Sequence, residues 1–200
     1  MRPPLYDLIA KRGNKKLPSS TAIFNMHPAH NCIAKKLGLC KAAEQGAKCY
    51  AFKAEYLYPN VLPYRKRQEK FWKKISAEKF ANQFMAINAV KRKKFTMLRL
   101  SESGDFFDQT SVDKAEEIAK RLNTSNIKMY TYTSRSDLNF SKCENLIVVG
   151  SGFMKKGLAG QFNIVKNLKN RPKGFGICPM NCRKCNRCST RGMKTIVKAH

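Results

Sequence analysis

Acidic residues are scarce in this sequence of 200 residues. Thirteen Asp and Glu stand against forty Lys and Arg, which gives a formal net charge of +27. No acidic residue follows Glu144, although twelve Lys or Arg do. Such an excess predicts a polyanionic partner, and nucleic acid is the obvious one because phosphate contacts need no particular base sequence. A general basic bias of the host's proteins, or solubility alone, is the alternative explanation.

Long apolar runs are also missing. No window approaches twenty apolar residues, so the sequence predicts no membrane-spanning helix and no membrane partner. The first residues, Met-Arg-Pro-Pro-Leu-Tyr-Asp, lack the apolar core of a signal peptide. We therefore expect a cytoplasmic protein whose eight cysteines stay reduced and available as ligands. Without an internal repeat or a linker, residues 1–200 are predicted to form a single domain, with residues 1–18 as a basic arm along its surface.

Four cysteines fall within eleven residues near the end of the chain, inside a cysteine-rich segment at 174–192. Their spacing is C-x3-C-x2-C-x2-C, formed by Cys178, Cys182, Cys185 and Cys188. Thiolates this close in sequence are suited to a soft metal centre. The run is close to a ferredoxin-type motif read in reverse, which favours an iron–sulfur cluster. Zinc is the alternative metal, although structural zinc usually takes two separated C-x2-C pairs; reduced thiols without a metal are the third possibility.

A second group of cysteines lies in a long, irregular segment predicted at residues 27–63. Cys32, Cys40 and Cys49 have the spacing C-x7-C-x8-C, and His27 and His30 precede them. Loops of this length inside a compact domain are usually functional, and a bound metal can order them. Two arrangements remain open. Each cysteine group holds its own [4Fe–4S] cluster, the early one with an open iron or a histidine ligand, or the two groups contribute to a shared cluster.

The pattern of apolar residues predicts an α/β fold. Residues 64–94 have a helical stripe with a break near Ser76, and a second helix is expected to begin with Ser111 as its N-cap. Alternation of strands and helices indicates βαβ units and a mainly parallel sheet. We expect an incomplete (β/α) barrel of five or six strands with cysteine-rich loops. The predicted strands are 21–26, 95–100, 127–133 and 145–150, with weaker candidates at 162–165 and 194–198.

An acidic stretch follows the second predicted strand. Acids in the first turn of the next helix suit the helix dipole, but Glu102, Asp105 and Asp108 precede that turn and need another explanation. Gly104 between them permits close backbone approach to a ligand. Because the carboxyl ends of parallel strands share one rim, these residues are expected to lie near Arg135, which follows the third strand.

Four motifs carry a resemblance to a known family: Cys49-Tyr50-Ala51, Leu100-Ser-Glu-Ser-Gly-Asp-Phe106, Tyr132-Thr-Ser-Arg135 and the late cysteine run. Together they resemble phage proteins grouped as gene product 88-like, over most of the chain from the first strand to Cys188. A phage origin implies location in the host cytoplasm.

The chain is also remotely similar to radical S-adenosylmethionine enzymes. That resemblance implies a partial (β/α)6 barrel, cluster cysteines in the loop after the first strand, and a cofactor site at Gly104 with Glu102 or Asp105. If the protein is such an enzyme, Glu102, Gly104 and Asp105 are expected to hold the cofactor and Arg135 is a candidate contact for substrate or carboxylate. The sequence departs from the family pattern because the C-x3-C-x2-C spacing is found at the late cysteines. A cluster ligated by four cysteines has no open iron for S-adenosylmethionine.

Two functions follow. The first is an iron–sulfur protein with a radical-SAM-like barrel that acts on or with nucleic acid, as an enzyme if S-adenosylmethionine binds. The alternative is a non-catalytic, basic nucleic-acid-binding module stapled by zinc or a closed cluster. Thiol redox catalysis is disfavoured because no isolated C-x-x-C follows a strand.

Overall fold

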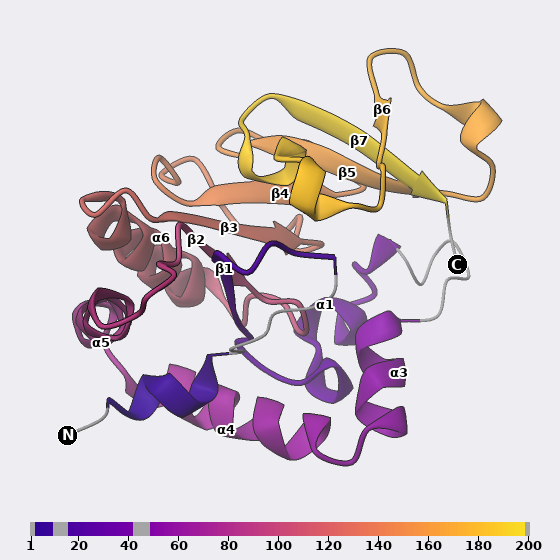
Figure 1. The fold of residues 1–200 in the computed structure, drawn as a ribbon. Helices are drawn as coiled ribbons and strands as arrows, with labels where there is room; N and C mark the ends of the chain where they lie inside the picture. The colour runs from indigo at the N-terminus through magenta and orange to yellow at the C-terminus, as the bar shows by residue number, and fades with distance from the viewer. Residues whose placement is uncertain (1–2, 10–15, 42–48, 199–200) are drawn as a thin grey trace.

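The sheet of this α/β protein is open and entirely parallel. A computed structural model describes residues 3–9, 16–41 and 49–198, and within them seven strands are arranged in the order β1-β2-β3-β4-β5-β7-β6 (Figure 1). Every neighbouring pair runs parallel. The strands are β1 (Thr21–Phe24), β2 (Met97–Leu100), β3 (Lys128–Thr133), β4 (Ile147–Ser151), β5 (Gly160–Val165), β6 (Gly176–Ile177) and β7 (Met193–Lys198).

The parallel α/β class is confirmed, and all six predicted strands are present. The expected count of five or six is wrong, because the two-residue strand β6 was not predicted. The sheet does not close, since β1 and β6 form its two edges. It is therefore an open parallel sheet, and the predicted incomplete-barrel form is not confirmed.

Helices follow the expected pattern with one correction. The helical stretch breaks at Ser76, whose side chain caps the second helix by accepting a hydrogen bond from the Lys79 backbone N–H. At the next helix, α6, the N-cap is Asp108 and the prediction of Ser111 is wrong, because the Asp108 carboxylate accepts from the Ser111 backbone N–H. The helices are α1 (Ile33–Lys36), α3 (Tyr50–Leu57), α4 (Val61–Lys74), α5 (Ala77–Ala89) and α6 (Gln109–Asn123).

One face of the sheet forms the main core. Alternate residues along the strands, such as Phe24, Leu98, Leu100 and Met129, pack against buried side chains of α4, α5 and α6. Helix α6 contributes a stripe at helical spacing, composed of Val112, Ala115, Ile118, Ala119 and Leu122. In Figure 1 these three helices run along the lower and left side of the sheet.

The opposite face of the sheet carries different side chains. Because neighbouring residues of a strand point to opposite faces, Met97 and Arg99 of β2 and Tyr130 and Tyr132 of β3 face away from the helices. A small second cluster forms here, in which Tyr130 packs with Ile147 and Ala159 and is joined by Met97, Tyr132 and Cys188. The late cysteine segment thus lies over the sheet face that the helices leave uncovered.

Two segments differ from their expected form. Part of the predicted surface arm, the 3-10 helix Pro4–Leu8, buries Leu5 and Leu8 in the main core, while residues 1–2 and 10–15 lie outside the described residues. The loop predicted at 27–63 contains α1 and α3 and the start of α4. No helix among the described residues is long and apolar enough to cross a lipid bilayer.

Candidate metal centre

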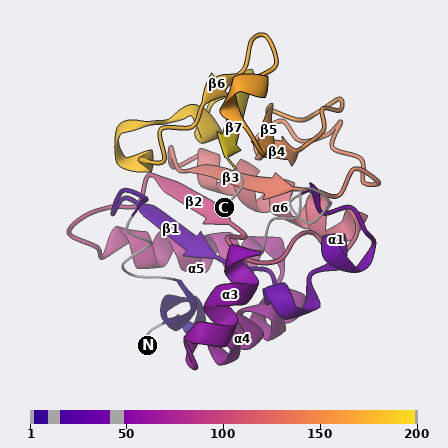
Figure 2. The same ribbon diagram turned by 90° about the vertical axis from the view of Figure 1, so that its right-hand side faces the viewer.

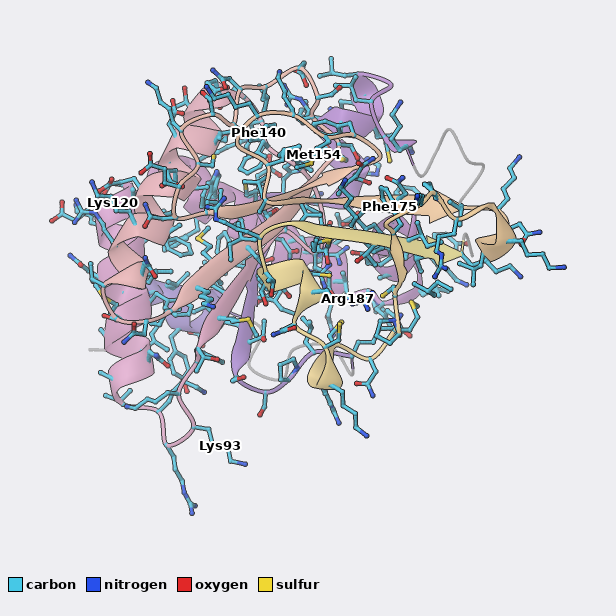
Figure 3. All side chains as sticks on the ribbon, turned by 90° about the horizontal axis from the view of Figure 1, so that it is seen from above. Lys93, Lys120, Phe140, Met154, Phe175 and Arg187 are labelled. Atoms are coloured by element: carbon cyan, nitrogen blue, oxygen red, sulfur yellow. The ribbon has the colours of Figure 1, made fainter. Side chains whose placement is uncertain are left out.

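The four late cysteines line one hollow on the uncovered sheet face. Cys178 directly follows β6, and its backbone N–H donates to the Ile196 carbonyl of β7 at 2.8 Å. The next three lie in or beside two 3-10 turns, Cys182–Lys184 and Arg187–Ser189, and the second turn contacts β3. The hollow has a volume of about 50 Å³. Seen from above, the turn with Arg187 lies over the middle of the sheet (Figure 3).

Burial and neighbouring groups shift the pKa of the Cys188 thiol. Burial raises the pKa of the Cys188 thiol, the Tyr132 hydroxyl lowers it through a hydrogen bond, and Cys178, Cys182 and Cys185 raise it again. All eight cysteines of the chain are free thiols. Among the described residues, however, no three His, Cys, Asp or Glu side chains already stand in a metal-coordinating arrangement.

The chemistry around the hollow fits an anionic thiolate centre. Arg99 and Thr21 line it together with the cysteines. Arg99 Nε and Thr21 Oγ1 are both buried, and neither has a hydrogen-bond partner in the part of the chain that the structure describes. Unpaired buried donors are rare because each one loses its bond to water. Four soft thiolates with N–H and O–H donors beside them are the donor set and second shell that a zinc ion or an iron–sulfur cluster accepts.

Arg99 connects the hollow to the loop after β2. Its guanidinium lies 5.5 Å from the centre of the Tyr132 ring. On its other side, Nη1 is 3.6 Å from Glu102 Oε1 and Nη2 is 3.5 Å from the Tyr50 hydroxyl, which donates to the Glu102 carbonyl at 2.7 Å. Sequence analysis missed Arg99. The available signal was a charged residue inside an otherwise apolar parallel strand, Met97-Leu-Arg-Leu100.

The early cysteines are only partly brought together. Burial raises the pKa of Cys32 to about 11, and the Asp105 carboxylate and the Cys40 thiol raise it as well. Cys49 is exposed and immediately precedes α3. Residues 42–48 between Cys40 and Cys49 lie outside the described residues.

The two candidate histidine ligands have partners within the protein. His27 is buried, with Nδ1 2.9 Å from the Pro28 carbonyl oxygen, while Nε2 accepts from the Asp105 backbone N–H at 3.0 Å. The His30 ring stacks on Phe52, with 6.2 Å between ring centres. Both rings thus join the loop after β1 to neighbouring segments.

The predicted cofactor residues do lie at one rim of the sheet, but most of their polar groups form hydrogen bonds within the protein. Asp105 accepts hydrogen bonds from the backbone N–H groups of Phe106 and Ser134 and from the Thr133 hydroxyl, and burial raises its pKa to about 6. These bonds tie the loop after β2 to the end of β3.

Gly104 and Arg135 are enclosed in the same way. A Cβ on Gly104 would lie 2.6 Å from the His27 carbonyl oxygen, so the close approach that this glycine permits is to His27. The Arg135 guanidinium donates to both carboxylate oxygens of Asp137 and to the Phe106 and Phe107 carbonyls. Of the predicted cofactor set, Glu102 alone is paired with a group that lines the hollow.

Sequence analysis also missed the polar group that holds this rim together. Glu55 of α3 is buried and accepts hydrogen bonds from the Ala29 and His30 backbone N–H groups, from Arg65 Nη1 at 2.9 Å and from the Ser103 hydroxyl. A single carboxylate thereby connects α3 and α4 to the loops after β1 and β2. No sequence signal pointed to it, because an acid on a short helix is usually exposed.

Comparison with known proteins identifies the family. The model of the family described as gene product 88 matches residues 7–157, and no curated protein or solved structure matches the chain. The matched range includes Cys32, Cys40, Cys49, Arg99 and the acidic stretch after β2. It ends before the late cysteines, so the resemblance is shown for residues 7–157 and not for the part that extends to Cys188. The chain belongs to the gene product 88 family of phage proteins.

Proposed function

We propose that this protein is an iron–sulfur protein that acts on or with nucleic acid, and that Cys178, Cys182, Cys185 and Cys188 hold a [4Fe–4S] cluster against the uncovered face of the sheet. The observation that carries the proposal is the single hollow lined by four thiols and by the unpaired buried donors Arg99 Nε and Thr21 Oγ1.

The segment itself supplies a second argument. None of the residues 178–192 is buried, and the two 3-10 turns contain no core residue. Such a stretch cannot be ordered by apolar burial, whereas metal–thiolate bonds order segments of this kind. A cluster is favoured over zinc because the four cysteines form one run instead of two separated pairs.

Arg99 would support the bound cluster in a defined way. Its cationic guanidinium favours the negative charge of four thiolates, and its Nε–H is available to a sulfur atom. Four cysteine ligands leave no iron open, so the proposal includes no S-adenosylmethionine at this position. Glu102 would orient Arg99 through their 3.6 Å contact.

The metal is tested by anaerobic purification followed by iron, sulfide and zinc analysis and a visible spectrum. We expect equimolar iron and sulfide and a broad absorption that bleaches with dithionite. Cys185→Ser should lose most of this iron. Cys143→Ala, which removes a buried thiol outside both groups, should keep it. Iron lost in Cys32→Ser as well would indicate that the early cysteines also bind iron. A colourless zinc protein would support the alternative zinc-stapled module.

The nucleic-acid part rests on the charge of +27. It is tested by the affinity for an oligonucleotide over a range of salt concentrations. If several phosphates are neutralised, log K falls linearly with log salt, with a slope of about −0.7 to −0.9 for each phosphate. An affinity that does not respond to salt, or none at all, would contradict this part without affecting the metal result.

A further inference from the structure

An exposed aromatic surface lies on α3 and at its C-terminal cap. We define it as Tyr50, Phe52, Tyr56 and Tyr58, whose exposed fractions are 62%, 41%, 84% and 60%. The inward side of α3 buries only Ala51 and Glu55. Phe52 and Tyr56 are four residues apart and so lie next to each other on the helix. In Figure 2, α3 stands towards the viewer, on the side to which the arrowhead of β1 points.

Positive charge accompanies these rings. Lys35 Nζ of α1 lies 5.0 Å from the centre of the Phe52 ring, and Lys36 and Lys53 are exposed nearby. The one acidic residue of α3, Glu55, is buried and paired with Arg65. The α3 helix therefore presents no carboxylate to solvent among its aromatic side chains.

Exposed rings beside lysines are typical of surfaces that bind single-stranded nucleic acid. Each base can stack on a ring whatever its identity, and the lysines neutralise phosphates. A duplex hides the faces of its bases, so it cannot use the rings in this way. Tyrosine also serves in protein interfaces, but the charge of +27 and the neighbouring lysines favour a nucleic acid over a protein partner.

We infer that the α3 aromatic surface binds single-stranded nucleic acid by stacking bases on Tyr56 and Tyr58, with Lys35 and Lys53 at the phosphates. This inference rests on the proposed nucleic-acid function and names its site and its form of substrate. The Tyr50 hydroxyl reaches the Glu102 carbonyl, and Glu102 contacts Arg99, so a strand bound here lies next to the sheet face that carries the late cysteines.

The test uses full-length protein purified anaerobically and a labelled oligothymidylate, free or annealed to its complement. Tyr56→Leu and Tyr58→Leu keep apolar volume but remove the stacking ring, and each should weaken single-strand binding at least about fivefold. Tyr56→Phe keeps the ring and should bind like wild type. Lys93→Ala, which removes an exposed lysine between α5 and β2, controls for charge alone (Figure 3).

The possible outcomes distinguish failure of this inference from failure of the proposed function. Single-strand binding that both leucine variants retain would overturn the inference and leave the proposed function standing. Preference for the duplex would also overturn it. Absence of any nucleic-acid binding by the wild type would refute the inference together with the nucleic-acid part of the proposed function. Equal weakening by Tyr56→Phe and Tyr56→Leu would show that the hydroxyl, and not stacking, makes the contact, which again overturns the inference.

Discussion

Loss of the Glu55 charge should destabilise this protein more than loss of any surface carboxylate. The Glu55 and Arg65 side chains are only 4% and 7% exposed, and their Oε1 and Nη1 atoms are 2.9 Å apart. Removing one partner of a buried ion pair leaves the other charge uncompensated in a medium of low polarity, which typically costs about 3–5 kcal/mol. We therefore expect Glu55→Gln to lower the free energy of unfolding by about that amount.

The assay is urea denaturation of the protein as purified anaerobically, compared at constant m value. Glu69→Gln is the matched control, because Glu69 pairs with Lys73 at 2.6 Å in a pair that is partly open to water, with the Glu69 and Lys73 side chains 16% and 56% exposed. Exposed pairs contribute about 0–1 kcal/mol. In the double variant Glu55→Leu with Arg65→Met no unpaired charge remains, so it should be more stable than Glu55→Gln. If Glu55→Gln costs no more than Glu69→Gln, Glu55 does not organise the rim.

Two further predictions concern the loop after β2. Gly104→Ala should lower the free energy of unfolding by roughly 1–3 kcal/mol, because the φ of Gly104 is +78° and the new Cβ would clash with His27. Gly38→Ala is the control, since Gly38 has a φ of +69° but nothing within 4 Å of the new Cβ. It shares the backbone strain without the clash and should cost less when both are measured by urea denaturation. Burial raises the pKa of Asp105 from 3.8 to about 6, so between these pH values the folded protein holds a proton that the unfolded chain has lost. The free energy of unfolding should therefore fall by up to about 3 kcal/mol as the pH rises from about 4 to 7. Asp105→Asn should flatten this pH dependence. A rise in stability over this range that disappears in the variant would contradict the assigned sign.

Strands could be predicted where their own residues form a β-branched, aromatic or continuously apolar run. Ile127–Thr133 is β-branched and aromatic, and the run after Asn145 is continuously apolar, as buried parallel strands are. The two-residue strand β6 carries no such signal, since it exists only through its pairing with β7. Helix α3 was missed for a related reason: its inward side consists of Ala51 and Glu55, so no apolar stripe marks it.

The candidate site was predictable as a set of residue types but not as a set of contacts. The spacing of the late cysteines predicted a single group, and the four thiols do line one hollow. Asp105 and Arg135 were chosen because charged groups at strand ends often face a ligand. Both turn inward to backbone partners instead. Sequence spacing places a carboxylate at a rim, but whether a backbone N–H reaches it depends on how two distant loops meet.

The late cysteine segment covers side chains that belong to the residues matched by the family model. The gene product 88 match ends at residue 157 and contains β1 to β4, including Met97, Tyr130 and Tyr132 on the face that no helix covers. Apolar rings on a parallel sheet are stabilised only if something removes them from water. The segment that does so contributes Cys188 and turns without a buried residue, so its own apolar contacts are few. Pairing beside β7 orders one side of this segment, and the proposed cluster, bound by its four thiols, would order the other side and cover this face of the sheet.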